Sequence, residues 1–165
     1  MLFYSFPENK IMINIQRILH PTDFSDNSRR SLDYACTLAS RFQAELHLLF
    51  VVADAVVSVA PPMSGFLPEG YAEDVMQSAE NNLAQFELGS EADGLVVVRE
   101  VVHGSAFLEI IRYANDKEMD MIVMGTHGYT GLMHLLMGSV AENVVRKASC
   151  PVLTVHPEDH KFVMP

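Results

Sequence analysis

A buried strand runs into a glycine-rich loop at residues 121–128, which read MIVMGTHG, and nine residues later the chain reads Gly138-Ser139. The apolar run 121–124 predicts a strand, and residues 140–148 carry apolar side chains at helical spacing. A helix begins with backbone N–H groups that lack partners within the helix and with partial positive charge, which suits a phosphate. Glycine lets the backbone come close to a ligand. The stretch therefore predicts a strand, a phosphate-binding loop and a helix.

Outward from this stretch, expected strands alternate with expected helices. We expect strands at 17–20, 45–52, 95–102, 119–124 and 151–155, the first stopped by Pro21, and helices within 32–42, 69–88, 105–114 and 140–148. This alternation predicts an α/β fold, in which a five-stranded parallel sheet of order 3-2-1-4-5 has helices on both faces. Residues 53–68, rich in proline, predict a loop. No internal repeat or linker interrupts the chain, so we expect one domain over 12–157 with 1–11 as an N-terminal extension.

Two loops are expected to meet at one crevice. In open parallel sheets, ligands bind beyond the carboxyl ends of the strands where the winding reverses. For the order 3-2-1-4-5 this point lies between the first and fourth strands. The turn that begins at Thr22 and Asp23 and the loop that begins at Gly125 both leave the sheet there. This convergence favours a binding site over a pair of unrelated turns.

The composition bounds the possible partners. Lys and Arg number 11 and Asp and Glu 21, which gives a formal net charge of −10. Such acidity argues against a nucleic-acid surface and against an anionic membrane. No apolar run is long enough to cross a membrane, and the first ten residues lack a signal-peptide pattern. With Cys36 and Cys150 interpreted as small apolar residues in a reducing compartment, we expect a cytoplasmic protein.

Five segments carry a family resemblance: ILHPTDFS at 18–25, LLFV at 48–51, MGTHG at 124–128, GSVAENV at 138–144 and CPVLTV at 150–155. Together they resemble the universal stress protein family over about 17–155. The spacing Gly-x2-Gly-x9-Gly-Ser is similar to that of the ATP-binding branch of the family. The resemblance implies a Rossmann-like sheet of the adenine nucleotide alpha hydrolase-like type and a nucleotide-binding regulatory role in the stress response.

The resemblance also implies roles for residues that would bind ATP or AMP, with or without Mg²⁺. Asp23 would accept hydrogen bonds from the nucleoside, and Val51 would offer backbone groups and an apolar wall to adenine. Met124 and Gly125 would pass under the sugar, and Gly128 would let the loop turn. The N–H groups of Gly138, Ser139 and Val140, with the Ser139 hydroxyl, would bind the phosphates. The expected nucleotide-binding residues are Pro21, Thr22, Asp23, Val51, Met124, Gly125, His127, Gly128, Gly138, Ser139 and Val140. None is expected to be catalytic or to bind a metal.

Plainer interpretations stay open for these residues. Asp23 fits a turn or capping residue, Val51 a core valine, Gly138 a helix N-cap and His127 an exposed loop residue. His20 is interpreted as a hydrogen-bonded strand residue. Nucleotide-binding relatives often carry Arg or Lys at positions where this chain has Tyr129 and Met133-His134. Unless a metal ion or another loop supplies charge, a triphosphate would therefore be held mainly by backbone dipoles, which in an acidic chain would weaken binding or favour fewer phosphates.

Three functions fit the sequence. The first is an adenine-nucleotide-binding regulator. The second is a slow ATPase or nucleotidyl-transfer enzyme, against which the chain lacks both a Gly-x4-Gly-Lys-Ser/Thr loop and a Gly-x-Ser-x-Gly elbow. The third is a nucleotide-free interaction protein. We also expect a homodimer through the edge strand that contains Val152, Leu153, Thr154 and Val155.

Overall fold

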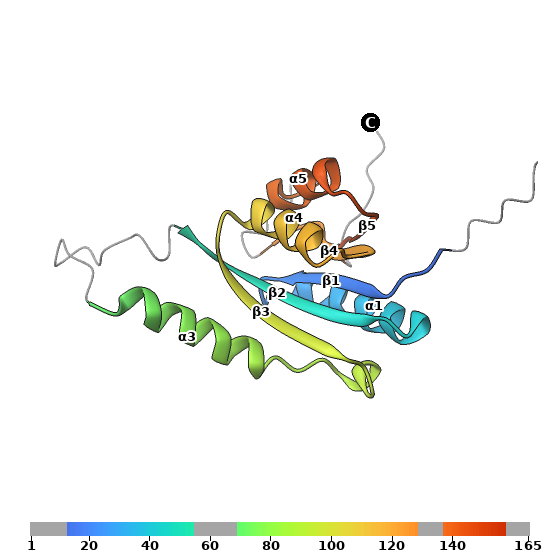
Figure 1. Cartoon of the computed structure of the whole chain (residues 1–165), viewed down its shortest axis with the longest axis horizontal. Coiled ribbons are helices and arrows are strands. Elements are labelled where there is room, and N and C mark those ends of the chain that lie inside the picture. Colours follow the sequence, from blue (N-terminus) through green and yellow to red (C-terminus); the bar gives the residue numbers. More distant parts are fainter. Residues whose placement is uncertain (1–12, 55–68, 129–136, 158–165) are drawn as a thin grey trace, which may run out of the picture.

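The strands lie in one parallel sheet. The computed structural model describes residues 13–54, 69–128 and 137–157. The strands are β1 (Arg17–Thr22), β2 (Glu45–Ala53), β3 (Val97–Gly104), β4 (Met121–Gly125) and β5 (Val152–Val155). All pairings are parallel and their order is β3-β2-β1-β4-β5, which confirms the predicted sheet (Figure 1).

Helices cover both faces of this sheet. Helices α1 (Asp26–Phe42) and α3 (Tyr71–Ala84) lie on one face, and α4 (Ala106–Asp116) and α5 (Ser139–Lys147) on the other (Figure 1). A short 3-10 helix, η1 (Ser90–Ala92), precedes β3. Alternate residues of β1 supply the two cores, because Ile18 packs with Leu32 of α1 and Leu83 of α3, whereas Leu19 packs with Ile110 of α4 and Val144 of α5.

Several element ends differ from expectation. Helix α3 ends at Ala84 instead of 88, and the chain beyond it turns so that Phe86 is buried against the α1 side of the sheet. Strand β3 begins at Val97 instead of 95, and Val96 is 65% exposed just after Gly94, whose φ is +82°. Of the expected loop 53–68, Ala53 belongs to β2 and residues 55–68 lie outside the described residues.

Pro21 does not stop β1, contrary to the sequence-based prediction. Pairing with β2 continues through Pro21 to Thr22, whereas pairing with β4 ends at Leu19 and Ile122. The N–H groups of Ile122 and Thr126 donate to the carbonyls of Pro151 and Val155, so the even-numbered residues of this segment direct their backbone groups to β5. Val123 lies between them and therefore directs its carbonyl to β1. The next β1 residue that would face it is Pro21, which has no N–H to donate.

The side chain of His20 takes the place of this missing donor. Its Nδ1 lies 2.9 Å from the Val123 carbonyl oxygen, which can only accept, so Nδ1 carries the proton. The ring is fully buried, and its Nε2 lies 3.5 Å from Ser28 Oγ. The interpretation of His20 as a hydrogen-bonded strand residue is confirmed.

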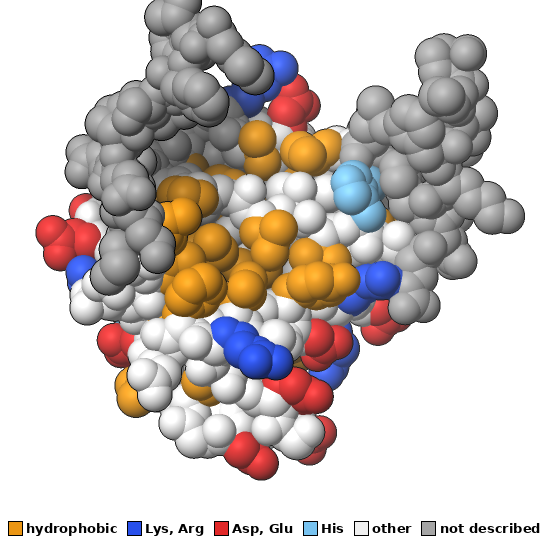
Figure 2. Space-filling view, turned by 90° about the vertical axis from the view of Figure 1, so that its right-hand side faces the viewer, with side chains coloured by type: hydrophobic (Ala, Val, Ile, Leu, Met, Phe, Trp, Pro, Cys, Tyr) orange, Lys and Arg blue, Asp and Glu red, His pale blue; other side chains and the backbone are white. Residues whose placement is uncertain are grey.

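The structure also bears on the cysteines and on the surface. Cys36 is fully buried in the core, and burial raises the pKa of its thiol to about 11, whereas Cys150 is only half-buried. Among the described helices, none is both long and apolar enough for a membrane span. On the face shown in Figure 2, hydrophobic side chains gather in the middle and charged side chains lie mainly at its lower margin. The large hydrophobic residues most exposed in the described part are Ile13, Tyr34, Phe42, Val96, Leu108, Val145 and Leu153.

Burial of His20 predicts a pH-dependent loss of stability. Burial lowers the pKa of His20 to about 4, from an ordinary value of 6.5. Between pH 6.5 and 4 the unfolded chain binds a proton at this residue and the folded chain does not, so stability falls as the pH falls. We expect a contribution of roughly 3 kcal/mol to be lost by pH 4.

The variant His20→Asn tests this, because its amide keeps a donor for Val123 without a group that titrates here. Urea unfolding at pH 7 and pH 4.5 should show a smaller acid-induced loss in the variant than in the wild type. Equal losses in the two proteins would contradict the assignment.

Candidate functional site

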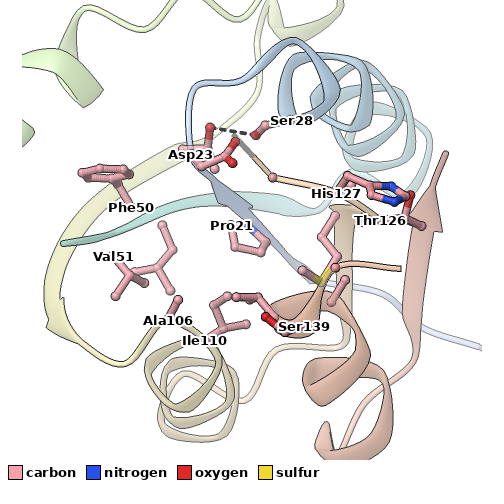
Figure 3. Close-up of a pocket in the computed structure, with 18 residues that line it drawn as sticks. Pro21, Asp23, Ser28, Phe50, Val51, Ala106, Ile110, Thr126, His127 and Ser139 are labelled. Atoms are coloured by element: carbon pink, nitrogen blue, oxygen red, sulfur yellow. Dashed lines mark hydrogen bonds between the residues drawn. The ribbon is translucent and has the colours of Figure 1, made fainter. Parts of the chain in front are cut away.

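A pocket opens where β1 and β4 separate (Figure 3). About 790 Å³ of space free of protein atoms lies between its walls, and part of this space is open to solvent. All eleven residues proposed from the sequence line it. The structure thus brings them together at the predicted switch point; their binding roles stay a prediction. The other lining residues are Ser28, Leu49, Phe50, Ala106, Ile110, Thr126 and Ala141.

The β1–α1 turn holds Asp23 in the pocket wall. One carboxylate oxygen, Oδ1, accepts hydrogen bonds from the N–H of Ser25 at 3.1 Å and from its hydroxyl at 2.6 Å. Ser25 in turn caps α1 by accepting from the N–H of Ser28. Asp23 therefore organises the turn, as the plainer interpretation expected, and lines the pocket as well.

Aromatic packing supports the same turn. Phe24 has a φ of +62°, a left-handed conformation that is uncommon for a bulky residue. Its ring lies 4.6 Å from that of Phe50 and 5.2 Å from that of Phe86, measured between centroids. Phe50 lines the pocket, so the packing of the turn extends to the pocket wall.

The glycines of the 125–128 loop permit close approach to the β1–α1 side. A Cβ atom at Gly125 would lie 2.6 Å from Asn27 Nδ2, and one at Gly128 would lie 2.7 Å from Asp23 Oδ2. The Asn27 amide donates to the carbonyl oxygen of His127, so α1 holds the loop directly. A larger side chain at either position would have to displace the Asn27 or Asp23 side chain or move the loop.

Gly138 has a different role from the one expected. Its N–H donates to the carbonyl oxygen of Thr126 at 2.7 Å, so it is used within the loop and is not free for a phosphate. A Cβ there would lie 3.2 Å from the same oxygen, so a larger residue would strain the loop before it filled a ligand position. Gly138 is the N-cap of α5, as the plainer interpretation held.

The first turn of α5 presents the free donors. The first N–H of the helix with a helical partner is that of Glu142, which donates to Gly138. The N–H groups of Ser139, Val140 and Ala141 precede it, and all three residues line the pocket. These groups, with the hydroxyl of the exposed Ser139, can bind an anion.

At the opposite end of the pocket, β2 extends beyond β1. Pairing with β1 ends at Phe50, whereas pairing with β3 continues through Val51 to Ala53. In the parallel register that ends at Thr22 and Phe50, the N–H of Val51 faces the carbonyl of Thr22, so the Val51 carbonyl is the group on this edge with no strand partner in the described part of the chain. That carbonyl can accept a hydrogen bond from a flat heterocycle, and the half-buried Val51 side chain adds an apolar surface.

His127 is half-buried rather than an exposed loop residue. Its Nδ1 lies 2.9 Å from the hydroxyl of Thr126, which also lies 3.4 Å from Nδ1 of His156. In Figure 3 the imidazole of His127 turns toward Thr126 and away from the middle of the pocket. Within the described residues, no group of three or more His, Cys, Asp or Glu side chains is arranged to hold a metal ion.

Sequence reasoning missed the wall that α4 contributes. Ala106 and Ile110 line the pocket from the first turns of α4. Neither residue type carries a chemical signal. The available signal was positional: α4 follows β3, which neighbours β2, and so begins at the same edge of the sheet.

Comparison with known proteins identifies relatives of this chain. The model of the universal stress protein family matches residues 14–156. Universal stress protein MJ0531 of Methanocaldococcus jannaschii is 37% identical over 140 residues, which cover 85% of this chain and 81% of that protein. The solved structure of hypothetical protein MJ0577, from the same organism, is 30% identical with a TM-score of 0.73 and covers 90% of this chain and 100% of that chain. A universal stress protein in complex with cAMP is 23% identical with a TM-score of 0.58, over 87% of this chain and 98% of that chain.

The contact between Gly125 and Asn27 predicts an energetic coupling. Gly125→Ala places a methyl group against the Asn27 amide and should lower the free energy of unfolding by about 1–3 kcal/mol. Asn27→Ala removes the hydrogen bond to His127 and should cost about 1 kcal/mol. In the double variant the methyl group has no amide to displace, so we expect a loss smaller than the two single losses together. Urea unfolding of the four proteins measures this, and strict additivity would contradict the contact.

Proposed function

The chain belongs to the universal stress protein family, and on that premise we propose that it binds an adenine nucleotide in the switch-point pocket and acts as a regulatory protein in the stress response. The observation that carries the proposal is the meeting of all eleven sequence-derived residues in one pocket. They come from four separate segments of the chain, so their convergence is a property of the fold.

The pocket offers a suitable environment to each part of a nucleotide. The open edge at Val51 and the rings and methyl groups of Phe50, Ala106 and Ile110 suit a purine. The Asp23 carboxylate lies across from Gly128 and suits ribose hydroxyl groups, which donate hydrogen bonds. The first turn of α5 suits a phosphate.

One structural neighbour supports the ligand class by analogy. The universal stress protein in complex with cAMP has the same fold and holds an adenine nucleotide. At 23% identity its likeness extends to the fold alone, so the proposal for this chain rests on its own pocket.

Calorimetric titration with AMP and with ATP tests the proposal directly, and native mass spectrometry of the purified protein tests it independently. Saturable binding of either nucleotide, or a copurified adenine nucleotide, supports it. Absence of heat and of a bound mass at millimolar nucleotide would favour a nucleotide-free interaction protein.

A pocket-filling substitution should abolish binding without unfolding the chain. Ala106→Phe places a ring in the pocket from the first turn of α4, and we expect nucleotide affinity to fall at least about tenfold. Leu108→Phe is the matched control, because Leu108 lies on the same helix, is 50% exposed and does not line the pocket. Unchanged nucleotide affinity in a folded Ala106→Phe protein would indicate that the adenine base does not bind next to Ala106.

The proposal includes a homodimer through β5. This strand is the last in the sheet order, so one of its edges faces no other strand of the described chain. Leu153, a residue of this strand, is 37% exposed. The carbonyl groups of Pro151 and Val155 point to the β4 side, where they accept from Ile122 and Thr126. Because neighbouring residues of a strand direct their backbone groups to opposite sides, Val152 and Thr154 direct theirs to the open edge. Antiparallel pairing of two copies would satisfy both edges about a two-fold axis.

Thr154→Pro removes an outward donor and should convert the dimer to a monomer in size-exclusion chromatography with light scattering. Thr154→Val keeps the N–H and should stay dimeric. Circular dichroism checks that both variants fold. A monomeric wild type, or a folded Thr154→Pro protein that dimerises as strongly, would contradict pairing through β5.

A further inference from the structure

We propose that the pocket is built for a nucleotide with one phosphate group, so that this protein binds AMP in preference to ADP and ATP when no divalent cation is present. The inference rests on the proposed function and concerns the charge of the ligand that the same pocket accepts.

Among the described residues that line the pocket, none is Lys or Arg. Among the lining residues of the described chain, Asp23 carries the single formal charge when His127 is counted as neutral, and that charge is negative. The two internal segments outside the described residues, 55–68 and 129–136, contain neither Lys nor Arg in their sequence. The chain as a whole carries a formal charge of −10, which adds to the repulsion of a highly charged anion.

Seven of the nine Lys and Arg side chains of the described chain have contacts outside the pocket, and none of the nine lines it. Three arginines form ion pairs: Arg17 with Glu118, Arg112 with Glu109 and Arg146 with Glu142. Arg99 donates to the carbonyl oxygens of Leu83 and Phe86. Arg29, Lys117 and Lys147 lie over the rings of Phe86, Tyr113 and Phe107. None of these side chains lines the pocket.

The neutral donors of the pocket are enough for one phosphate group. The N–H of Gly138 is bonded to Thr126, which leaves those of Ser139, Val140 and Ala141 and the Ser139 hydroxyl. All belong to a single helix turn, where the positive end of the helix dipole is also located. Each further phosphate would bring negative charge beyond this turn, where the described lining residues offer no Lys or Arg to compensate it.

Titration calorimetry with adenosine, AMP and ATP tests the inference. The full chain is used, so that the terminal segments with Lys10 and Lys161 are present. In buffer with EDTA at low salt, AMP should bind more tightly than adenosine, and at least about tenfold more tightly than ATP. Magnesium, which neutralises part of the triphosphate charge, and added salt should both narrow the gap between AMP and ATP.

Two variants at one position separate charge from shape. Ser139→Lys adds a cation at the first turn of α5 and should shift the ratio of ATP to AMP affinity toward ATP by about tenfold. Ser139→Gln adds a long neutral side chain and removes the same hydroxyl, so it is the reference against which the shift caused by the added charge is measured. Circular dichroism checks that both proteins fold.

The outcomes distinguish this inference from the proposed function. If none of the three ligands binds the wild type, the proposed function itself fails. If ATP without Mg²⁺ binds as tightly as AMP, or adenosine binds as tightly as AMP, the pocket binds an adenine compound but is not built for one phosphate. If Ser139→Lys and Ser139→Gln shift the ratio equally, charge does not set the preference.

Discussion

The contact between His20 and the carbonyl of Val123 joins the two halves of the sheet at the place where they separate. Pro21 has no N–H with which to continue the ladder to β4, yet β1 continues along β2 to Thr22. Without another donor the Val123 carbonyl would be buried and unpaired, at a cost of about 1–3 kcal/mol. The imidazole supplies that donor, so β1 and β4 can diverge and leave room for a pocket while the sheet beneath stays closed.

Contacts between distant segments then shape that opening. The side-chain amide of Asn27, at the start of α1, donates to the carbonyl of His127, one hundred residues further along the chain. The N–H of Gly138 donates to the carbonyl of Thr126. The two residues that follow β4 are thus held by both helices, His127 by α1 and Thr126 by the start of α5. Glycine at 125 and 128 permits this close approach, because a Cβ at either position would have to displace the side chain of Asn27 or Asp23.

The sequence predicted those parts of the structure that depend on the order of strands, helices and loops along the chain. Strand order and the placing of Asp23, Val51 and the glycine loop follow from alternating apolar runs and from the rule that loops after parallel strands share one edge. The wall made by Ala106 could not be read in this way, since alanine has no chemical signal and its place depends on how α4 packs. The expected free N–H of Gly138 was wrong because its partner, the Thr126 carbonyl, becomes its neighbour only when the loop folds back. Pairing through β5 and the identity of the ligand depend on molecules outside one chain, and they stay predictions.

The left-handed conformation of Phe24 shows that the turn at the pocket is held in a strained form. A non-glycine residue with a φ of +62° costs of order 1–2 kcal/mol. Two aromatic contacts, with Phe50 and Phe86, are worth about 0.5–1.5 kcal/mol each and offset that cost. The turn can therefore hold the Asp23 carboxylate against the glycine loop before any ligand arrives, and a carboxylate fixed in advance loses less conformational entropy on binding. Strain of this kind is found preferentially at ligand sites, and here it lies at the turn that carries the one formally charged residue of the described pocket wall.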